Sequence, residues 1–235
     1  MLRSFLLRSL LVLLFLPACA RAQSSIARSQ TPPPAAQVLL SPDTPVVTFT
    51  LDFPSSEPEH YAISLTFAGT GHYQSNGRLS LDSDISDTFD FDFTVSEATR
   101  SRVFGLAAKA GYFQKNLDSH RKDIAFTGKK TLRYTDAVRT GEATYNYSSN
   151  PAADELTVLF QNLSTTLEFG HRLDYDRHYQ KLAIDQELKR MQEMFKSNGL
   201  GELTAIRPVL EQIIADQSIM NISRARAQRL LTPPQ

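Results

Sequence analysis

The chain has 235 residues, with 25 basic and 25 acidic side chains, one cysteine and no tryptophan. A formal net charge of zero provides no basic face for a phosphate backbone, which excludes nucleic-acid binding of the electrostatic kind. Because Cys19 is the only cysteine, disulfide frameworks and sites built from several thiolates are excluded as well.

The first 22 residues are predicted to be an export signal. Arg3 and Arg8 give a positive start, residues 10–16 form a short apolar run, and Ala20-Arg21-Ala22 supplies the small residues for cleavage. Cleavage there removes three arginines and no acidic residue, leaving 213 residues with a net charge of −3 and no cysteine. We therefore expect an exported protein, periplasmic or extracellular.

The leader has a second interpretation as a lipoprotein signal. Leu16-Pro17-Ala18-Cys19 has the leucine-to-cysteine spacing of a bacterial lipoprotein box, so a lipid on Cys19 would tether the chain to a membrane. Pro17 is unusual in such a box, and cleavage after Ala22 would instead release a soluble protein. The mature chain contains no later apolar run long enough to span a bilayer, so no transmembrane segment is expected there.

The mature chain is predicted to be an α+β protein. Residues 23–45, which include Thr31-Pro32-Pro33-Pro34, form an expected disordered Pro/Ser-rich lead. Residues 46–150 are expected to form a small antiparallel sheet of about six strands with one packed helix. Residues 151–235 are expected to form a long helix and a C-terminal helical hairpin, packed on or beside the sheet.

The strands are predicted from the alternation of apolar and polar side chains that begins at Val46. They are expected around residues 46–53, 61–67, 79–81, 89–93, 124–134 and 143–147. Asn76-Gly77 predicts a hairpin turn, because both residue types tolerate positive φ. Lys129-Lys130 is expected to stay solvated at a strand edge or bend.

The helices are predicted from capping residues and apolar stripes. Ser96 is expected to cap a helix that stops at Gly111, and Asn150-Pro151 to open a second helix. An unbroken helix to Asn198-Gly199 would be about 70 Å long, so a bend is expected near Gly170. The terminal hairpin around residues 216–218 is similar to a single HEAT-type repeat and is expected to pack on the preceding helix.

The front half resembles a class of small exported bacterial α+β domains. The resemblance, over residues 46–169, rests on a Pro-x-x-Tyr alternation followed by Gly-x-Gly-x-Tyr. These positions are Pro58, Tyr61, Ile63, Leu65, Gly69, Gly71 and Tyr73. The class has no assigned chemistry, so the resemblance implies architecture and export and adds no catalytic residue.

The densest acidic cluster includes Asp82, Asp84 and Asp87, and it is a candidate calcium-binding loop. Asp82-x-Asp84 begins like such a loop, but no glycine follows at the turning position and no glutamate closes it. The neighbouring Asp90 and Asp92 fit better as the solvated face of a phenylalanine-rich strand. We therefore predict no calcium site.

A second candidate metal site lies on the long helix. Glu168-x-x-His171 has the spacing of half a carboxylate-bridged di-iron site, and Asp174 and His178 lie within two further turns. Such a site needs a second Glu-x-x-His helix, whereas the other copy, residues 57–60, falls in a loop. Asp174 and His178 are more simply a surface pair four residues apart. We predict no metal and no cofactor, with these four side chains as the candidate ligands.

Six tyrosines gather in the sheet half, where they form an aromatic face or simply pack as good strand residues. They are Tyr61, Tyr73, Tyr112, Tyr134, Tyr145 and Tyr147. An exposed tyrosine face would suit a sugar or a peptide, whereas packing of the rings in the core is the structural explanation.

The leading functional hypothesis is a non-enzymatic interaction module of the cell envelope. Its helical part would bind another envelope protein or a second copy. One alternative is a small-ligand module that uses the tyrosine face for a sugar or peptide. The other is a hydrolase whose site joins His171, Asp174 or His178 to the sheet. No catalytic residue is assigned.

Overall fold

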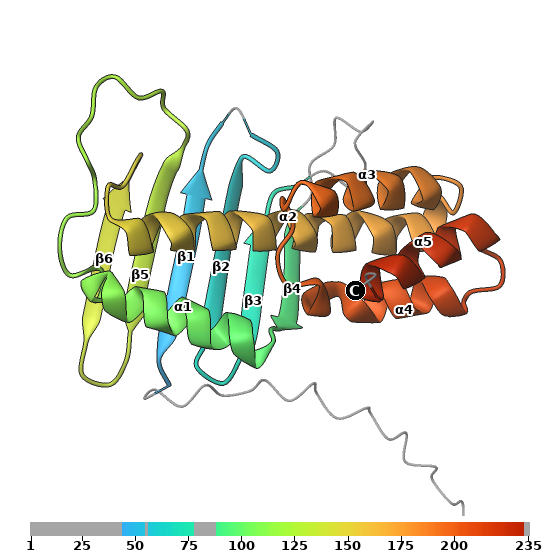
Figure 1. The fold of residues 1–235 in the computed structure, drawn as a ribbon, viewed down its shortest axis with the longest axis horizontal. Helices are drawn as coiled ribbons and strands as arrows, with labels where there is room; N and C mark the ends of the chain where they lie inside the picture. Colours follow the sequence, from blue (N-terminus) through green and yellow to red (C-terminus); the bar gives the residue numbers. More distant parts are fainter. Residues whose placement is uncertain (1–43, 55, 78–87, 233–235) are drawn as a thin grey trace, which may run out of the picture. The chain divides into compact units, whose positions relative to one another are not determined.

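The computed structural model describes residues 44–54, 56–77 and 88–232, and their framework is a six-stranded antiparallel sheet (Figure 1). The strands are β1 (Val46–Asp52), β2 (His60–Thr66), β3 (Thr70–Ser75), β4 (Phe89–Thr94), β5 (Lys129–Thr135) and β6 (Thr140–Tyr145). They lie in the order β4-β3-β2-β1-β5-β6, and each neighbouring pair is antiparallel.

The first two helices cross one face of the sheet, and the later helices lie beyond its β4 edge (Figure 1). The helices of the described region are α1 (Glu97–Lys109), α2 (Pro151–Tyr179), α3 (Ile184–Lys196), α4 (Arg207–Ala215) and α5 (Asn221–Leu231), with 3-10 turns η1 (Gly111–Phe113) and η2 (Leu203–Ile206). The hairpin α4–α5 packs on α2 and α3. The predicted α+β fold is confirmed.

Alternation along the strands determines which face of the sheet the helices cover. In β1, Val47, Phe49 and Leu51 are buried, while the threonines between them are partly exposed. Phe49 stacks on Phe160 of α2, with ring centroids 5.4 Å apart and an interplanar angle of 2°. The sheet and the helices share one continuous hydrophobic core, so α2 is part of the sheet's own packing.

The predicted helix starts are confirmed by their caps. The Ser96 hydroxyl accepts a hydrogen bond from the Thr99 backbone N–H at 3.3 Å. Asn150 Oδ1 accepts from the backbone N–H groups of Ala152 and Ala153 at 3.0 and 3.3 Å. These side chains satisfy amide groups that have no partner within the first helical turn.

The strand prediction misses β3, which pairs with β2 after a turn at Gly69 (φ +90°). Tyr73 is its only large apolar residue, so the strand carries little alternation. Gly71 lies under the Phe93 ring, where a Cβ atom would come within 2.3 Å of a ring carbon.

Phe67, which was expected inside the second strand, follows the end of β2 and is 49% exposed. The strand expected at 79–81, like Asp82, Asp84 and Asp87, lies outside the described residues.

The prediction of a solvated Lys129-Lys130 pair is wrong for Lys130, which is buried. Its Nζ donates to the backbone oxygens of Thr127 at 3.0 Å, Asn146 at 2.9 Å and Gly128 at 3.3 Å, and to the Thr127 hydroxyl at 2.9 Å. Burial lowers the pKa of Lys130. These oxygens replace the water that the ammonium group loses on burial. The strand is also shorter than predicted, because β5 begins at Lys129 and not at residue 124.

The bend expected at Gly170 is also wrong, since α2 continues through this position to Tyr179. Gly170 is buried, and a Cβ atom there would lie 2.5 Å from Cγ2 of Ile206 in η2. The glycine therefore permits a close approach between α2 and η2. The helix ends instead at Tyr179, and residues 180–183 separate it from α3.

Two helical glycines provide a matched test of this packing. Gly170→Ala is expected to destabilise the fold by about 1 kcal/mol or more, because overpacking outweighs the better helix propensity of alanine. Gly105→Ala in α1, where a Cβ atom meets nothing within 4 Å, is expected to stabilise it by about 1 kcal/mol. Urea unfolding measures both; a stabilising Gly170→Ala would contradict the close contact.

Candidate functional site

A pocket of about 220 Å³ opens between α2 and the adjoining ends of β1 and β2. One wall is largely apolar and includes Leu51, Pro58 and Tyr61. The other wall belongs to α2 and is polar. Its side chains are Gln161, Ser164, Thr165, Glu168 and Arg172, and Ser56 and Glu57 complete the lining. Their spacing of three or four residues places the helical members on one face of α2.

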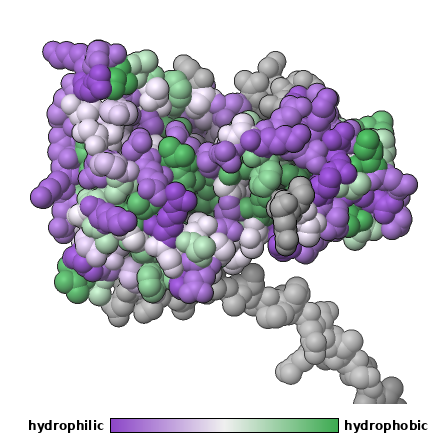
Figure 2. Space-filling model, in the orientation of Figure 1, coloured by the Kyte–Doolittle hydropathy of each residue, from purple (hydrophilic) through white to green (hydrophobic). Residues whose placement is uncertain are grey.

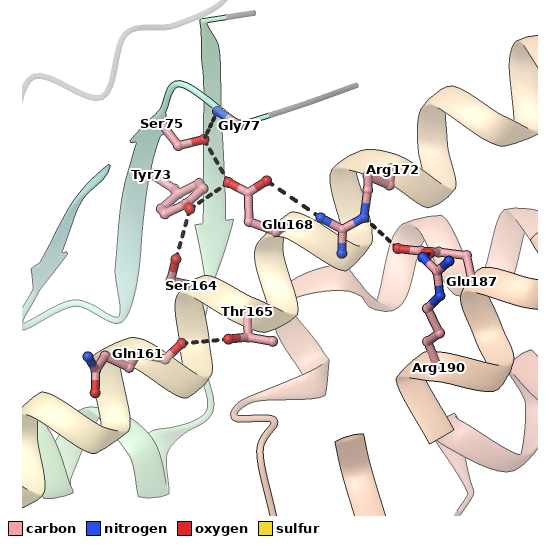
Figure 3. Close-up of polar contacts among 10 residues, drawn as sticks. All are labelled: Tyr73, Ser75, Gly77, Gln161, Ser164, Thr165, Glu168, Arg172, Glu187 and Arg190. Carbon is pink, nitrogen blue, oxygen red and sulfur yellow. Dashed lines mark hydrogen bonds and ion pairs between the residues drawn. The ribbon is translucent and has the colours of Figure 1, made fainter. Parts of the chain in front are cut away.

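Glu168 is the central acid of this pocket (Figure 3). Its side chain is only 5% exposed. Glu168 Oε1 accepts hydrogen bonds from the hydroxyls of Tyr73 and Ser75, each at 2.7 Å. The Ser164 hydroxyl lies 2.9 Å from that of Tyr73, so β3 and α2 are joined by a buried polar network.

The second carboxylate oxygen of Glu168 is differently placed. Glu168 Oε2 is buried, and no group among the described residues donates a hydrogen bond to it. It forms only a long ion pair with Arg172 Nη1, at 3.9 Å. A Cβ atom on Gly77 would lie 2.5 Å from Oε2, so the glycine leaves room for this oxygen.

Arg172 is held mainly by another acid, Glu187 of α3. Arg172 Nε donates to Glu187 Oε1 at 2.5 Å, and Arg190 Nη1 lies 3.4 Å from Glu187 Oε2 (Figure 3). The side chains of Arg172 and Glu187 are 12% and 6% exposed. Ion pairs this strongly buried depend on a complete set of partners.

Burial shifts the pKa values of nearby groups. Desolvation raises the pKa of Tyr73 well above its ordinary value, and the charge of Glu168 acts in the same direction. Desolvation likewise raises the pKa of Tyr61. Both phenols therefore remain protonated at neutral pH, and the Tyr73 hydroxyl remains a donor to Glu168. Desolvation, followed by the charge of Glu187, raises the pKa of Asp176 to about 6, while Arg172 opposes the shift.

Asp176→Asn is expected to stabilise the protein at pH 8 more than at pH 4. The raised pKa of folded Asp176 means that its contribution to stability is fully present below about pH 4, its unfolded pKa. That contribution is lost as the pH rises to about 6. Urea unfolding of both proteins at pH 4, 6 and 8 measures the difference, and equal effects at all three would contradict the shift.

The structure does not bring the four candidate metal ligands together. Glu168 points toward Tyr73 and Ser75, whereas the His171 ring stacks on Phe89 with centroids 3.8 Å apart. Asp174 and His178 form the expected surface pair, with Nδ1 and Oδ1 3.8 Å apart. Within residues 44–54, 56–77 and 88–232, no three His, Cys, Asp or Glu side chains are grouped to hold a metal ion.

The tyrosine face, considered as an alternative ligand surface, is mostly covered. Tyr61, Tyr73, Tyr134 and Tyr145 are buried in the core beneath the helices, which supports the structural explanation. The hydroxyls of Tyr73, Tyr134 and Tyr145 bond inside the protein: that of Tyr145, for example, lies 2.6 Å from the Thr157 hydroxyl. Tyr147 is 38% exposed.

Sequence reasoning missed Arg172 and the hydroxyl partners of Glu168. The available signal was a polar series, Ser164, Glu168 and Arg172, spaced four residues apart beside the buried Leu163 and Leu167. Charged residues adjoining an apolar stripe are usually solvated, and only the packing of β3 shows that these are buried.

No protein-family model matches the chain, and no curated protein matches it significantly. Across the described residues, no helix combines the length and the hydropathy needed to cross a membrane. The functional proposal below therefore rests on the geometry of the pocket.

Proposed function

We propose that the chain is an exported protein that binds a small polar molecule in the Glu168 pocket. The observation that carries this proposal is the buried Glu168 Oε2, to which no described residue donates a hydrogen bond. Buried polar atoms are nearly always satisfied, so each exception needs an explanation. A donor group on a bound molecule would complete the coordination of this oxygen.

The size of the pocket limits the ligand. Its volume of about 220 Å³ is below the range of roughly 300–1,000 Å³ common for drug-sized ligands. The combination of one apolar wall with one polar wall suits a compact molecule that has a polar head and a short apolar portion. This favours a metabolite-sized ligand over a peptide.

An NMR fragment screen on the full chain tests the proposal. Small polar fragments are expected to shift the amide signals of residues 56–61 and 161–172 in a saturable manner. Gln161→Trp should fill the pocket and abolish these shifts. Val158→Trp, at a 50% exposed position on the same helix, is the matched control. Shifts that cluster elsewhere, or no shifts at all, would contradict ligand binding at this site.

A second candidate function is self-association through the end of the helical part. Four large apolar side chains are 41–81% exposed there: Tyr179, Leu182, Met220 and Ile222, here called the apolar tip. Lys181 links their two segments, because its Nζ lies 2.8 Å from Asp216 Oδ2. Figure 2 shows hydrophobic residues among hydrophilic ones at this end.

We take a second copy as the partner of the apolar tip. Lys181 and Asp216 place one cation and one anion side by side, so a two-fold related copy would oppose each with its complement. Sedimentation is expected to show a dimer that Leu182→Ser weakens. Because Leu182 is 81% exposed, the variant should retain its melting temperature. A monomer at all concentrations would contradict this candidate.

A further inference from the structure

We propose that the molecule bound in the Glu168 pocket carries a protonated amine, an inference that rests on the proposed function of this pocket. The ligand class would be a small organic cation with a short apolar portion. The ammonium group would donate to Glu168 Oε2.

Among the described residues, the charged groups joined to Glu168 and Glu187 do not balance. Three buried carboxylates, from Glu168, Asp176 and Glu187, face the buried guanidinium group of Arg172 and the 39% exposed one of Arg190. One negative charge is therefore left over when all three acids are ionised.

The excess charge can be assigned to Glu168 because the other acid in the ion-pair series is well paired. Glu187 receives Arg172 Nε at 2.5 Å and Arg190 Nη1 at 3.4 Å. Within the described part of the chain, Glu168 Oε2 has Arg172 Nη1 at 3.9 Å and no hydrogen-bond donor, although the side chain is only 5% exposed. A buried carboxylate oxygen in this state favours a cationic donor, since hydrogen bonds to charged groups are the strong ones.

An anionic ligand fits these contacts poorly. Arg172 is the guanidinium that lines the pocket, and its Nε is already bonded to Glu187. An anion placed beside it would also lie close to Glu168. An amine fits better. When its ammonium group reaches Glu168, the apolar side chains of Leu51, Pro58 and Tyr61 would contact the rest of the molecule.

Three probes of equal chain length test this inference: n-butylamine, n-butanol and butyrate, titrated into the full chain at pH 7 and followed by amide NMR. We expect n-butylamine to shift residues 56–61 and 161–172 in a saturable manner. The neutral and anionic probes should bind there at least tenfold more weakly. If either binds as tightly as the amine, the inference is overturned while ligand binding by the pocket stands.

Variants separate the charge effect from loss of the pocket. Glu168→Gln is expected to weaken n-butylamine binding at least tenfold, whereas Glu155→Gln, at an exposed position of the same helix, should leave it unchanged. Should Glu168→Gln not fold, Gln161→Trp blocks the pocket from its rim and should abolish binding. If no probe shifts the pocket, the amine inference is overturned, and a negative fragment screen would overturn the pocket's function as well.

Discussion

Glu168→Ala is expected to lower the free energy of unfolding by about 3–4 kcal/mol, because it removes the acceptor of a buried network. The hydroxyls of Tyr73 and Ser75 would lose the oxygen to which both donate at 2.7 Å. Arg172 would also lose one of its two acidic partners while remaining 12% exposed. Urea denaturation followed by circular dichroism measures the loss.

The matched control for this substitution is Glu155→Ala, on the same helix. Glu155 pairs with Arg102 at 2.7 Å, but their side chains are 44% and 63% exposed. Exposed pairs contribute about 0–1 kcal/mol, so this variant should remain close to wild type. Equal losses in the two variants would show that Glu168 has no special role in the fold.

Phe160→Ala is expected to destabilise the protein by about 3–5 kcal/mol, because it removes a large, fully buried side chain from the core. The Phe160 ring stacks on Phe49 of β1 and so connects the helical half of the sequence to the sheet. The variant should lower the stability of the whole sheet, as measured by hydrogen exchange of β1 amides.

Val158→Ala serves as the comparison, since Val158 is 50% exposed on the same helix. Its expected effect is within about 0.5 kcal/mol, as for surface substitutions in general. If Phe160→Ala left the β1 amides protected, residues 46–150 would form a sheet that is stable without α2.

The sequence predicted those elements in which a local signal was strong. Phe89, Phe91 and Phe93 alternate with aspartates and form β4, and the caps Ser96 and Asn150 begin α1 and α2. β3 escaped prediction because its stability comes from its neighbours: Tyr73 is buried by α2, and Gly71 fits beneath Phe93. Such contacts join residues that are far apart in sequence.

The same reason explains why the candidate site was only partly predicted. Glu168 was singled out by its spacing from His171, yet the structure turns the two side chains toward different neighbours, Tyr73 and Phe89. A bend is predicted near Gly170 from the length of about 70 Å that an unbroken helix to residue 198 would have, whereas in the structure this glycine admits Ile206. The sequence pattern identified Glu168 and Gly170 as notable residues, but tertiary packing determined what each one contacts.

The strand order has a consequence for how the chain folds. β1 pairs with β2 through a short connection, but its other edge pairs with β5, so that Val46 lies opposite Thr135. While synthesis proceeds from the N-terminus, β1, β2 and β3 can form a meander, yet one edge of β1 keeps its amide and carbonyl groups unpaired until β5 arrives. Non-local closure of this kind slows folding, and an open edge invites pairing with other chains. Docking of β5 is therefore expected to limit the folding rate and to end the interval in which the nascent protein is most prone to aggregate.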